Sequence, residues 1–276
     1  MKDYSLYLEC RSGISGDMTV AALLDLGADR DILNKALQSL PIKGFRTSIT
    51  RVEKGGLTAC DFMVILDEEY ENHDHDMQYL HGTDCPADGE METGTSKDGS
   101  NASNGFRTLS DIRDILFRAE ITENARELSF RIFDILARGE AKAHGVGTDQ
   151  VQFHEKGAVD TIVDIVSVAV CMDNLGINKV FVSPLCEGRG FVRSRHGMLP
   201  VPVPAVANIV ADNGLSLRIT DYEGEFVTPT GAAIAAALKT TDILPKRFKT
   251  HRMGLGAGKR EYKLPGVLWA IIISED

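Results

Sequence analysis

A helix that begins at Asp160 and is apolar on almost every side constrains the fold most, because such a helix has to be buried. Its polar residues Asp160, Asp164 and Ser167 are spaced i, i+4 and i+7, so they line one stripe. Buried carboxylates without partners are costly, so basic groups, a metal or a wet cleft must lie opposite. The alternative is that Asp160 is an N-cap and Asp164 complements the helix dipole. His154 and Glu155, just before this helix, favour a functional site.

Strand and helix patterns alternate along the rest of the chain. Strands are expected at 5–10, 45–52, 57–66, 179–185, 215–222, 248–255 and 267–274, and further helices at 17–26, 30–40, 109–119, 122–144, 205–212 and 228–239. Glu53-Lys54-Gly55-Gly56 has the turn chemistry of a hairpin. We therefore expect an α/β fold, a mixed β-sheet with helices packed on it, as a single domain over residues 1–276.

Negative charge is concentrated in one segment. The chain has 40 acidic and 30 basic residues, and residues 67–105 hold eleven acids against Lys97, so the remainder balances 29 acids with 29 bases. This segment has few aliphatic residues, and we expect a disordered, acidic, histidine-containing insertion at about 68–105. Without a broad basic face the chain is a poor candidate for binding nucleic acid.

The composition indicates a cytoplasmic protein. No apolar run approaches the ~20 residues that span a bilayer, and the amino terminus lacks the pattern of a signal peptide. We therefore expect no membrane partner. Five scattered cysteines without a C-x-x-C pair favour reduced thiols over a disulfide framework.

A turn of small residues lies between the first strand and the first helix. Ser12, Gly13, Ser15 and Gly16 precede or begin the helix, with Asp17 in its first turn. Free backbone N–H groups at a helix start suit a phosphate or carboxylate. The turn matches no nucleotide-binding motif, and an ordinary tight turn is the alternative.

A second helix start offers a similar site. Thr228 is the expected cap, Pro229 occupies the first helical position and Thr230 follows. An anion site and a simple helix start are both open. Glu225 would bring a base or metal ligand near this site, although an exposed loop glutamate is the commoner outcome.

Residues 189–196 predict a strand rich in arginine. Arg189, Phe191, Arg193 and Arg195 would point to one face, where guanidinium groups form a receptor for an anion. The alternative is a solvated strand edge protected by charge. In contrast, the run at 254–259 leads toward a strand rather than a helix, and we do not interpret it as a nucleotide loop.

The insertion contains histidines near carboxylates, at His73, His75 and His81. Imidazoles two residues apart can chelate nickel, zinc or copper. The alternative is a solvated acidic segment with incidental histidines.

Taken together, these blocks resemble the LarC family of nickel insertion proteins. The resemblance rests on Ser12-Gly13-Ile14-Ser15-Gly16-Asp17-Met18, Phe153-His154-Glu155, Gly157-Ala158-Val159-Asp160, Val163-Asp164-Ile165-Val166, Gly188-Arg189-Gly190-Phe191-Val192, His196-Gly197, Leu199-Pro200-Val201-Pro202 and Val227-Thr228-Pro229-Thr230-Gly231. The family pattern commonly has aspartate at the position of Glu9, a hydrophobic residue at Lys156 and a small one at Arg195.

The resemblance implies a nickel chelatase, a lyase of cofactor biosynthesis. Such an enzyme inserts Ni(II) into pyridinium-3,5-bisthiocarboxylic acid mononucleotide to form the nickel-pincer cofactor of lactate racemase. It also implies CTP with Mg or Mn, bound mainly by a carboxyl-terminal domain that we expect to be a separate part. This chain would then be the amino-terminal part.

The predicted residues can be assigned roles in that reaction. The anionic substrate would suit Arg189, Arg193 and the two helix starts. Nickel would bind His154 and His196 at the centre, and the histidines of the insertion would collect it. The predicted catalytic residues are His154, Glu155, Asp160 and Asp17.

Two other classes stay open. One is a nickel storage protein or chaperone without catalysis, in which the insertion binds all the metal. The other is a nucleotide-dependent hydrolase that holds magnesium with Asp17 and Asp164. A homo-oligomer is compatible with each class.

Overall fold

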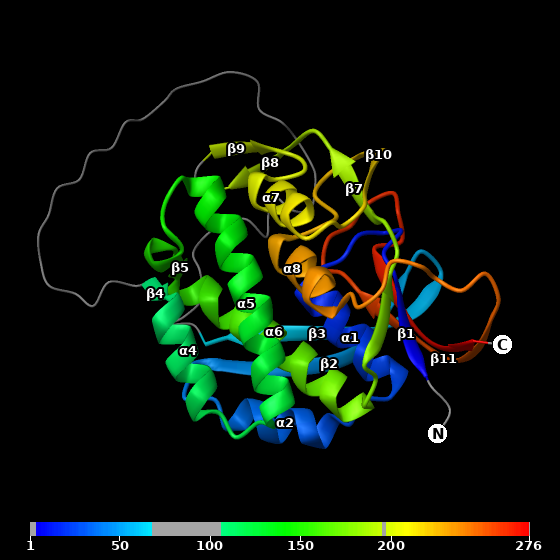
Figure 1. The fold of residues 1–276 in the computed structure, drawn as a ribbon, viewed down its shortest axis with the longest axis horizontal. Helices are drawn as coiled ribbons and strands as arrows, with labels where there is room; N and C mark the ends of the chain where they lie inside the picture. The colour runs from blue at the N-terminus through cyan, green and yellow to red at the C-terminus, as the bar shows by residue number, and fades with distance from the viewer. Residues whose placement is uncertain (1–3, 68–105, 195–196, 276) are drawn as a thin grey trace, which may run out of the picture.

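The structure, a computed structural model, describes residues 4–67, 106–194 and 197–275. In this part of the chain six strands form one mixed sheet in the order β2-β3-β11-β12-β1-β6 (Figure 1). The strands are β1 (Ser5–Glu9), β2 (Phe45–Lys54), β3 (Leu57–Leu66), β6 (Lys179–Val182), β11 (Phe248–Ala257) and β12 (Val267–Glu275). The predicted mixed α/β fold is confirmed.

Strand directions place several loops at one edge of the sheet. β1 runs parallel to β6, and both β1 and β11 run antiparallel to β12, while β3 is parallel to β11. Therefore β1, β3, β6 and β11 share one direction, and the residues that follow β1 and β11 emerge at the same edge. Ligand crevices of α/β sheets form at such edges.

The predicted hairpin is confirmed in β2 and β3. Lys54 pairs with Leu57, which leaves a two-residue turn of Gly55 and Gly56 with φ of 56° and 79°. Positive φ at both positions is the requirement of a type I′ turn, and glycine meets it without steric cost.

Helices cover the sheet in layers (Figure 1). They are α1 (Gly16–Leu26), α2 (Arg30–Gln38), α4 (Leu109–Arg118), α5 (Glu123–His144), α6 (Glu155–Leu175), α7 (Pro204–Asp212) and α8 (Pro229–Leu238), with one 3-10 turn, η1 (Thr148–Gln150). α1 packs on β3, β11 and β12, and α6 packs between α1 and α5. The apolar sides of α6 are thereby buried, as its sequence requires.

Helix ends agree with the sequence at most positions. Thr108 and Asp111 form a capping box at the start of α4, Thr122 caps α5, and Gly145 ends α5 with φ of 67°. The start of α6 was predicted wrongly: it begins at Glu155, so Asp160 lies in the second turn and is not an N-cap. Gly157 favours a turn before Asp160, but the packing of α6 on α1 and α5 outweighs the cost of about 1 kcal/mol for a glycine inside a helix.

Three strand pairs lie outside the main sheet, namely β4 (Phe106–Thr108) with β5 (Gln152–His154), β7 (Leu185–Arg189) with β10 (Leu217–Glu223), and β8 (Phe191–Ser194) with β9 (Gly197–Pro200). The predicted continuous strand at 189–196 is wrong. Gly190, with φ of 94°, separates β7 from β8. Arg189 pairs with Glu223 of β10, whereas Arg193 pairs with Met198 of β9.

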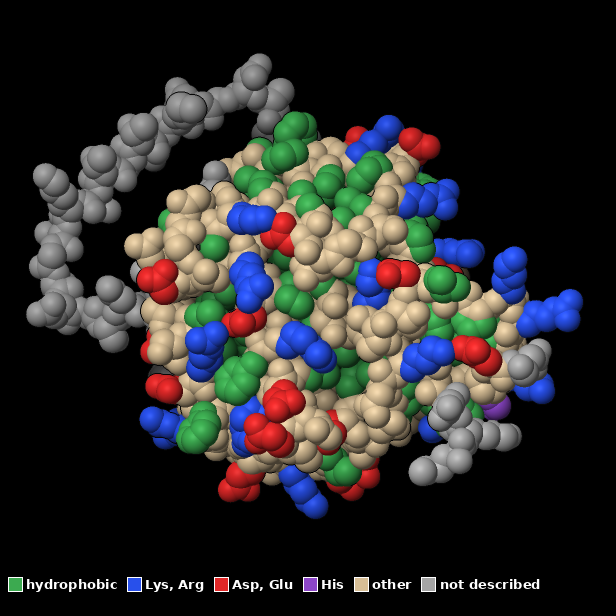
Figure 2. Space-filling view, in the orientation of Figure 1, with side chains coloured by type: hydrophobic (Ala, Val, Ile, Leu, Met, Phe, Trp, Pro, Cys, Tyr) green, Lys and Arg blue, Asp and Glu red, His purple; other side chains and the backbone are tan. Residues whose placement is uncertain are grey.

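The surface and the thiols agree with the composition where they can be seen. Acidic and basic side chains are interspersed on the face shown in Figure 2, which has no broad basic area. Cys10, Cys60, Cys171 and Cys186 are all free and buried. Within the described ranges, the helices are all too short or too polar to cross a membrane.

Candidate functional site

The two predicted helix starts meet in space. Ile14, in the turn before α1, forms a parallel bridge with Val227, just before α8. The Ile14 N–H donates to the Phe226 carbonyl at 2.9 Å, and the Thr228 N–H donates to the Ile14 carbonyl at 3.1 Å. Gly13 permits this approach, because a Cβ there would lie 2.0 Å from the Phe226 carbonyl oxygen. The sequence identified both turns but not their contact.

The helix N–H groups are largely engaged within the protein. The Thr228 hydroxyl accepts a hydrogen bond from the Gly231 N–H at 3.0 Å. At α1 the Ser15 side chain does not cap the helix but donates to the Asp17 carboxylate. The Asp17 N–H is itself bonded to the carboxylate of Asp164. The carboxylates of Asp17 and Asp164 therefore occupy the positive end of α1, where the sequence suggested an anion site.

The polar stripe of α6 faces this helix start. A Cβ on Gly16 would lie 2.4 Å from Oδ2 of Asp164, so the carboxylate sits directly on the first turn of α1. Asp164 Oδ1 and the Ser167 hydroxyl are buried without a hydrogen-bond partner among the described residues. Asp164 of the stripe therefore faces a polar group, Asp17, a third acid of the same cluster, whereas Ser167 has no hydrogen-bond partner among the described residues.

Proximity and burial shift the titration of these acids together. Burial raises the pKa of Asp164 well above its usual value, and the charges of Asp17 and Asp160 raise it further. The pKa of Asp17 is also raised, chiefly by burial, with partial offset from the Ser15 hydroxyl and from Lys259. Asp160 lies at the exposed rim of the cluster, where partial burial and the charge of Asp17 raise its pKa to about 6. All three acids therefore hold their protons to higher pH than a free aspartic acid does.

A lysine reaches the cluster from β11. Cβ atoms on Gly254 and Gly256 would lie 2.3 Å from the Ala22 carbonyl oxygen and 1.9 Å from that of Met18, so β11 packs directly against α1. This contact delivers Lys259 to the first turn of α1. Its ammonium group donates to Asp61 of β3, and its charge lowers the pKa values of Asp17 and Asp164.

A pocket of about 160 Å³ opens beside Lys259. It is lined from both helix starts and from the β11–β12 connection, by Ser12, Ser15, Asp17, Met18, Glu225, Phe226, Thr228, Gly258, Lys259, Arg260, Tyr262 and Gly266. Glu225 is not the exposed loop glutamate that is the commoner outcome: it is 9% exposed and pairs with Arg260. We call this the helix-start pocket.

A buried glutamate holds one wall of the helix-start pocket. Glu187 on β7 is fully buried, and its Oε1 accepts hydrogen bonds from the N–H groups of Gly188, Phe226 and Val227. Burial raises the pKa of Glu187 to about 7, and the three N–H donors limit the rise. Glu187 thereby fixes the segment that carries Glu225 and leads into Thr228.

A family model matches nearly the whole chain. The model, described as nickel insertion protein, matches residues 6–276. The chain belongs to the nickel insertion protein family. No solved structure matches it significantly.

Curated relatives carry more specific names. The pyridinium-3,5-bisthiocarboxylic acid mononucleotide nickel insertion protein of Alkaliphilus metalliredigens is 51% identical over 98% of this chain and 61% of its own length. The proteins of that name from Desulfitobacterium hafniense and Acetivibrio thermocellus are 37% and 35% identical, over 95% and 93% of this chain. The chain spans 56% to 61% of the length of these three relatives.

The structure brings some predicted site residues of this family member together and separates others. Ser12, Ser15, Asp17 and Thr228 line the helix-start pocket. Gly13, Gly16 and Thr230 belong to the same two helix starts, and Asp160 lies in the cluster beside Asp17. Arg189 and Arg193 are exposed on β7 and β8 and do not line the pocket. The predicted anion receptor of Arg189 and Arg193 therefore lies apart from the helix-start pocket, on two different strands, and stays a prediction.

The predicted nickel ligands lie wholly or partly outside the described residues. His73, His75, His81 and His196 lie outside the described residues, and for His154 and Glu155 only the main chain is described. That main chain ends β5 and begins α6. Among residues 4–67, 106–194 and 197–275 no group of three or more His, Cys, Asp or Glu is arranged to hold a metal ion.

Sequence reasoning missed Lys259, Arg260 and Asp61. The run that contains Lys259 leads to β12 rather than to a helix, as predicted, but it carried another signal. Gly254, Gly256 and Gly258 alternate along a strand, so one face has no side chains, which indicates a close approach of another backbone. That face is where β11 meets α1.

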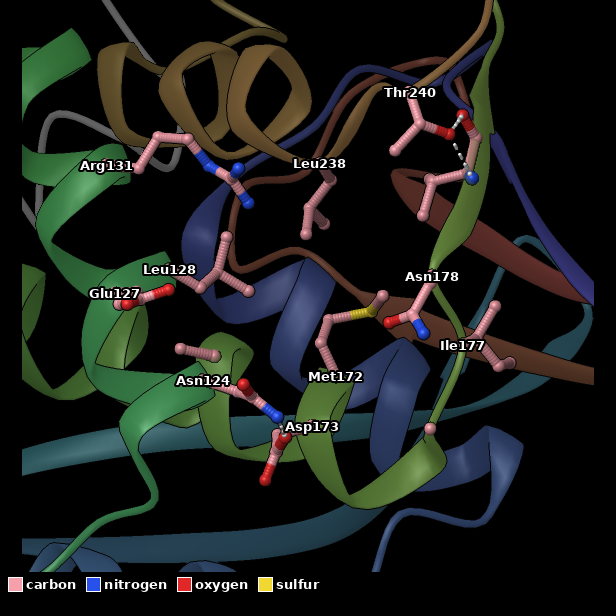
Figure 3. A pocket seen from close by; sticks show the side chains of 13 residues that line it. Asn124, Glu127, Leu128, Arg131, Met172, Asp173, Ile177, Asn178, Leu238 and Thr240 are labelled. Carbon is pink, nitrogen blue, oxygen red and sulfur yellow. Dashed lines mark hydrogen bonds between the residues drawn. The ribbon is translucent and has the colours of Figure 1, made fainter.

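A second hollow, of about 480 Å³, lies between α5, the end of α6 and β6 (Figure 3). Its polar groups are largely paired: Asn124 donates to Asp173 at 2.9 Å, and Thr240 bonds to the main chain of Val180. Glu127 and Arg131 approach it from α5. It contains none of the predicted site residues, so the helix-start pocket is the better candidate.

Proposed function

We propose that this chain takes part in nickel insertion into pyridinium-3,5-bisthiocarboxylic acid mononucleotide. The observation that carries the proposal is the 51% identity, over 98% of the chain, with a relative whose name states that substrate. Nickel is then cargo rather than a resident cofactor. Residues 1–276 would form one amino-terminal domain, since a single core cluster includes residues from β1 through β12.

Metal insertion needs a group that accepts protons. Ligands bind a metal ion in their deprotonated form, so any ligand that is protonated beforehand releases a proton as nickel binds. The cluster of Asp17, Asp160 and Asp164 suits this role because burial and mutual repulsion raise the pKa values of its members. A base with a pKa near the working pH combines availability with affinity for the proton.

Lys259 offsets part of the negative charge of this cluster. Its positive charge lowers the pKa values of Asp17 and Asp164, against the larger effect of burial. Asp61 holds the ammonium group in place. Proton uptake by the acids removes negative charge from the pocket wall, which favours an anionic substrate.

His154 remains the proposed nickel ligand nearest this cluster in the chain. It lies one residue before α6, and Asp160 is in the second turn of the same helix. Imidazole nitrogen suits Ni(II). His196, His73, His75 and His81 complete the proposed nickel path, with Glu155 as a further base.

We propose that CTP, with Mg or Mn, is bound mainly by a separate carboxyl-terminal part. The resemblance to LarC proteins and the partial coverage of the curated relatives support this division. The product would serve lactate racemase maturation in the cytoplasm.

Reconstitution tests the proposal directly. The chain is mixed with the nickel-free mononucleotide, Ni(II), CTP and Mg, with and without the carboxyl-terminal part of a relative, and nickel-containing product is measured by mass spectrometry. We expect product only when this chain is present. Equal product formation without the chain, or none in the complete mixture, contradicts the proposal.

A further inference from the structure

Arg260 is held in a fixed orientation at the helix-start pocket. Its Nη1 donates to the Glu225 carboxylate at 2.5 Å and to the Glu225 carbonyl at 3.1 Å, and it lies 3.3 Å from the Tyr262 hydroxyl. The Tyr262 hydroxyl also donates to the Glu225 carbonyl at 2.8 Å, and its ring packs on Phe226 with centroids 4.5 Å apart. All of these Arg260 hydrogen bonds are made by the same atom, Nη1.

The other edge of the guanidinium is available. Nε and Nη2 of Arg260 donate to no residue in the described part of the chain, yet they are not among the buried unpartnered atoms. The side chain is 27% exposed, and it lines the helix-start pocket. These two donors are therefore accessible to solvent on a side chain that lines the pocket. Because Nε and Nη2 lie in the plane of the guanidinium group, they can bind two oxygen atoms at once.

We propose that this free edge of Arg260 binds the phosphate of a pyridinium mononucleotide. This inference rests on the proposed function and assigns one end of its substrate. Lys259 precedes Arg260 in the lining of this pocket, and the hydroxyl groups of Ser12 and Thr228 line it as further donors. Glu225 fixes the guanidinium plane in advance, which reduces the entropy lost on binding.

The size of the pocket determines which part of the ligand enters. Complete small-molecule sites occupy roughly 300–1,000 Å³, and this pocket holds about 160 Å³. It takes the phosphate end, and the ring lies outside. The cluster of Asp17, Asp160 and Asp164 lies beside the adjoining first turn of α1, so a ring outside the pocket would lie near these acids.

A pair of available compounds isolates the phosphate. Nicotinamide mononucleotide and nicotinamide riboside share the pyridinium ring and ribose and differ in the phosphate. We expect the wild-type chain, titrated calorimetrically, to bind the mononucleotide at least about tenfold more tightly than the riboside. Arg260→Lys keeps a charge for Glu225 but loses the fork, so this preference should fall about tenfold, with riboside binding unchanged. Arg247→Lys, an exposed site outside the pocket, should bind both as wild type does.

Equal binding of the two compounds by the wild-type chain, including no binding of either, overturns the assignment. So does an Arg260→Lys chain that keeps the full preference. Thermal unfolding of each variant checks folding, and Glu225→Gln, which leaves Arg260 in place but loosens it, should lower the preference by a smaller factor. Nickel insertion by the wild-type chain is measured separately, so the phosphate assignment can fail while the proposed function stands.

Discussion

Two stretches of this chain each carry two cations in or just after a strand, and only one of the two stretches contributes to the helix-start pocket. Arg189 and Arg193 lie on β7 and β8, where both are exposed. Lys259 and Arg260 follow β11 and are paired with the buried acids Asp61 and Glu225. The local sequence favoured the first stretch, because it is richer in arginine. The difference shows that neighbours from other elements decide whether a cation belongs to a site.

The glycines of β11 make this difference. Gly256 allows α1 to approach so closely that no side chain fits between them, and the chain then leaves the strand at the first turn of α1. At the other stretch Gly190 turns the chain away from β7 into a separate hairpin. Glycine brings one stretch into contact with the acid cluster and separates the other from it.

The largest expected effect follows from closing that approach. In Gly256→Ala the new Cβ would lie 1.9 Å from the Met18 carbonyl oxygen, so α1 and β11 must separate. We expect a loss of about 3 kcal/mol in the free energy of unfolding, measured by urea denaturation. Gly147→Ala is the matched control, because its Cβ would meet only the end of the Asp149 side chain. Equal stability of the two variants would show that the contact between α1 and β11 is loose.

A smaller loss is expected from Lys259→Met. Asp61 is 7% exposed and would be left buried without its partner. We expect the free energy of unfolding to fall by about 2 kcal/mol, since Lys259 is itself partly exposed. The double variant Asp61→Asn with Lys259→Met should recover most of that loss, and additivity of the two single changes would contradict the pairing.

The acid cluster should make stability depend on pH. Asp160 has a folded-state pKa of about 6, above its value in the unfolded chain, so between about pH 4 and pH 6 the folded state binds more protons. Stability must then fall as pH rises through this window. Asp160→Asn should remove part of this loss of stability. It should stabilise the chain at pH 7.5 by only about 1 kcal/mol, because Asp160 is exposed and solvent screens its charge. Unfolding curves at pH 4.5 and 7.5 measure it; an unchanged difference between them contradicts the shift.

The smallest effect is expected at the exposed arginines. Replacing Arg189 and Arg193 together by alanine should change the free energy of unfolding by less than about 0.5 kcal/mol. Among the described residues, the guanidinium group of Arg189 forms an ion pair only with the exposed Asp221, at 3.5 Å. A drop larger than about 2 kcal/mol in urea denaturation would show that β7 and β8 depend on these side chains.

The sequence predicted those features that depend on neighbours along the chain. Glycine pairs gave the β2–β3 hairpin, Thr108 and Thr122 gave helix starts, and the spacing of Asp160 and Asp164 gave a polar stripe. It did not show that Ile14 pairs with Val227 or that Lys259 reaches Asp61, because these partners are about 200 residues apart. It also placed Arg189 and Arg193 on one face, because a local pattern does not show where glycine ends a strand.

The most direct test compares nickel insertion by two variants in the reconstituted reaction with the nickel-free mononucleotide, Ni(II), CTP and the carboxyl-terminal part. One carries Asp17→Asn and Asp164→Asn, which mimic the protonated acids and so preserve packing, and the other carries Arg189→Ala and Arg193→Ala. The account predicts that the first loses at least about 100-fold in initial rate while the second stays within about twofold of wild type. A fast aspartate variant together with a slow arginine variant would contradict it.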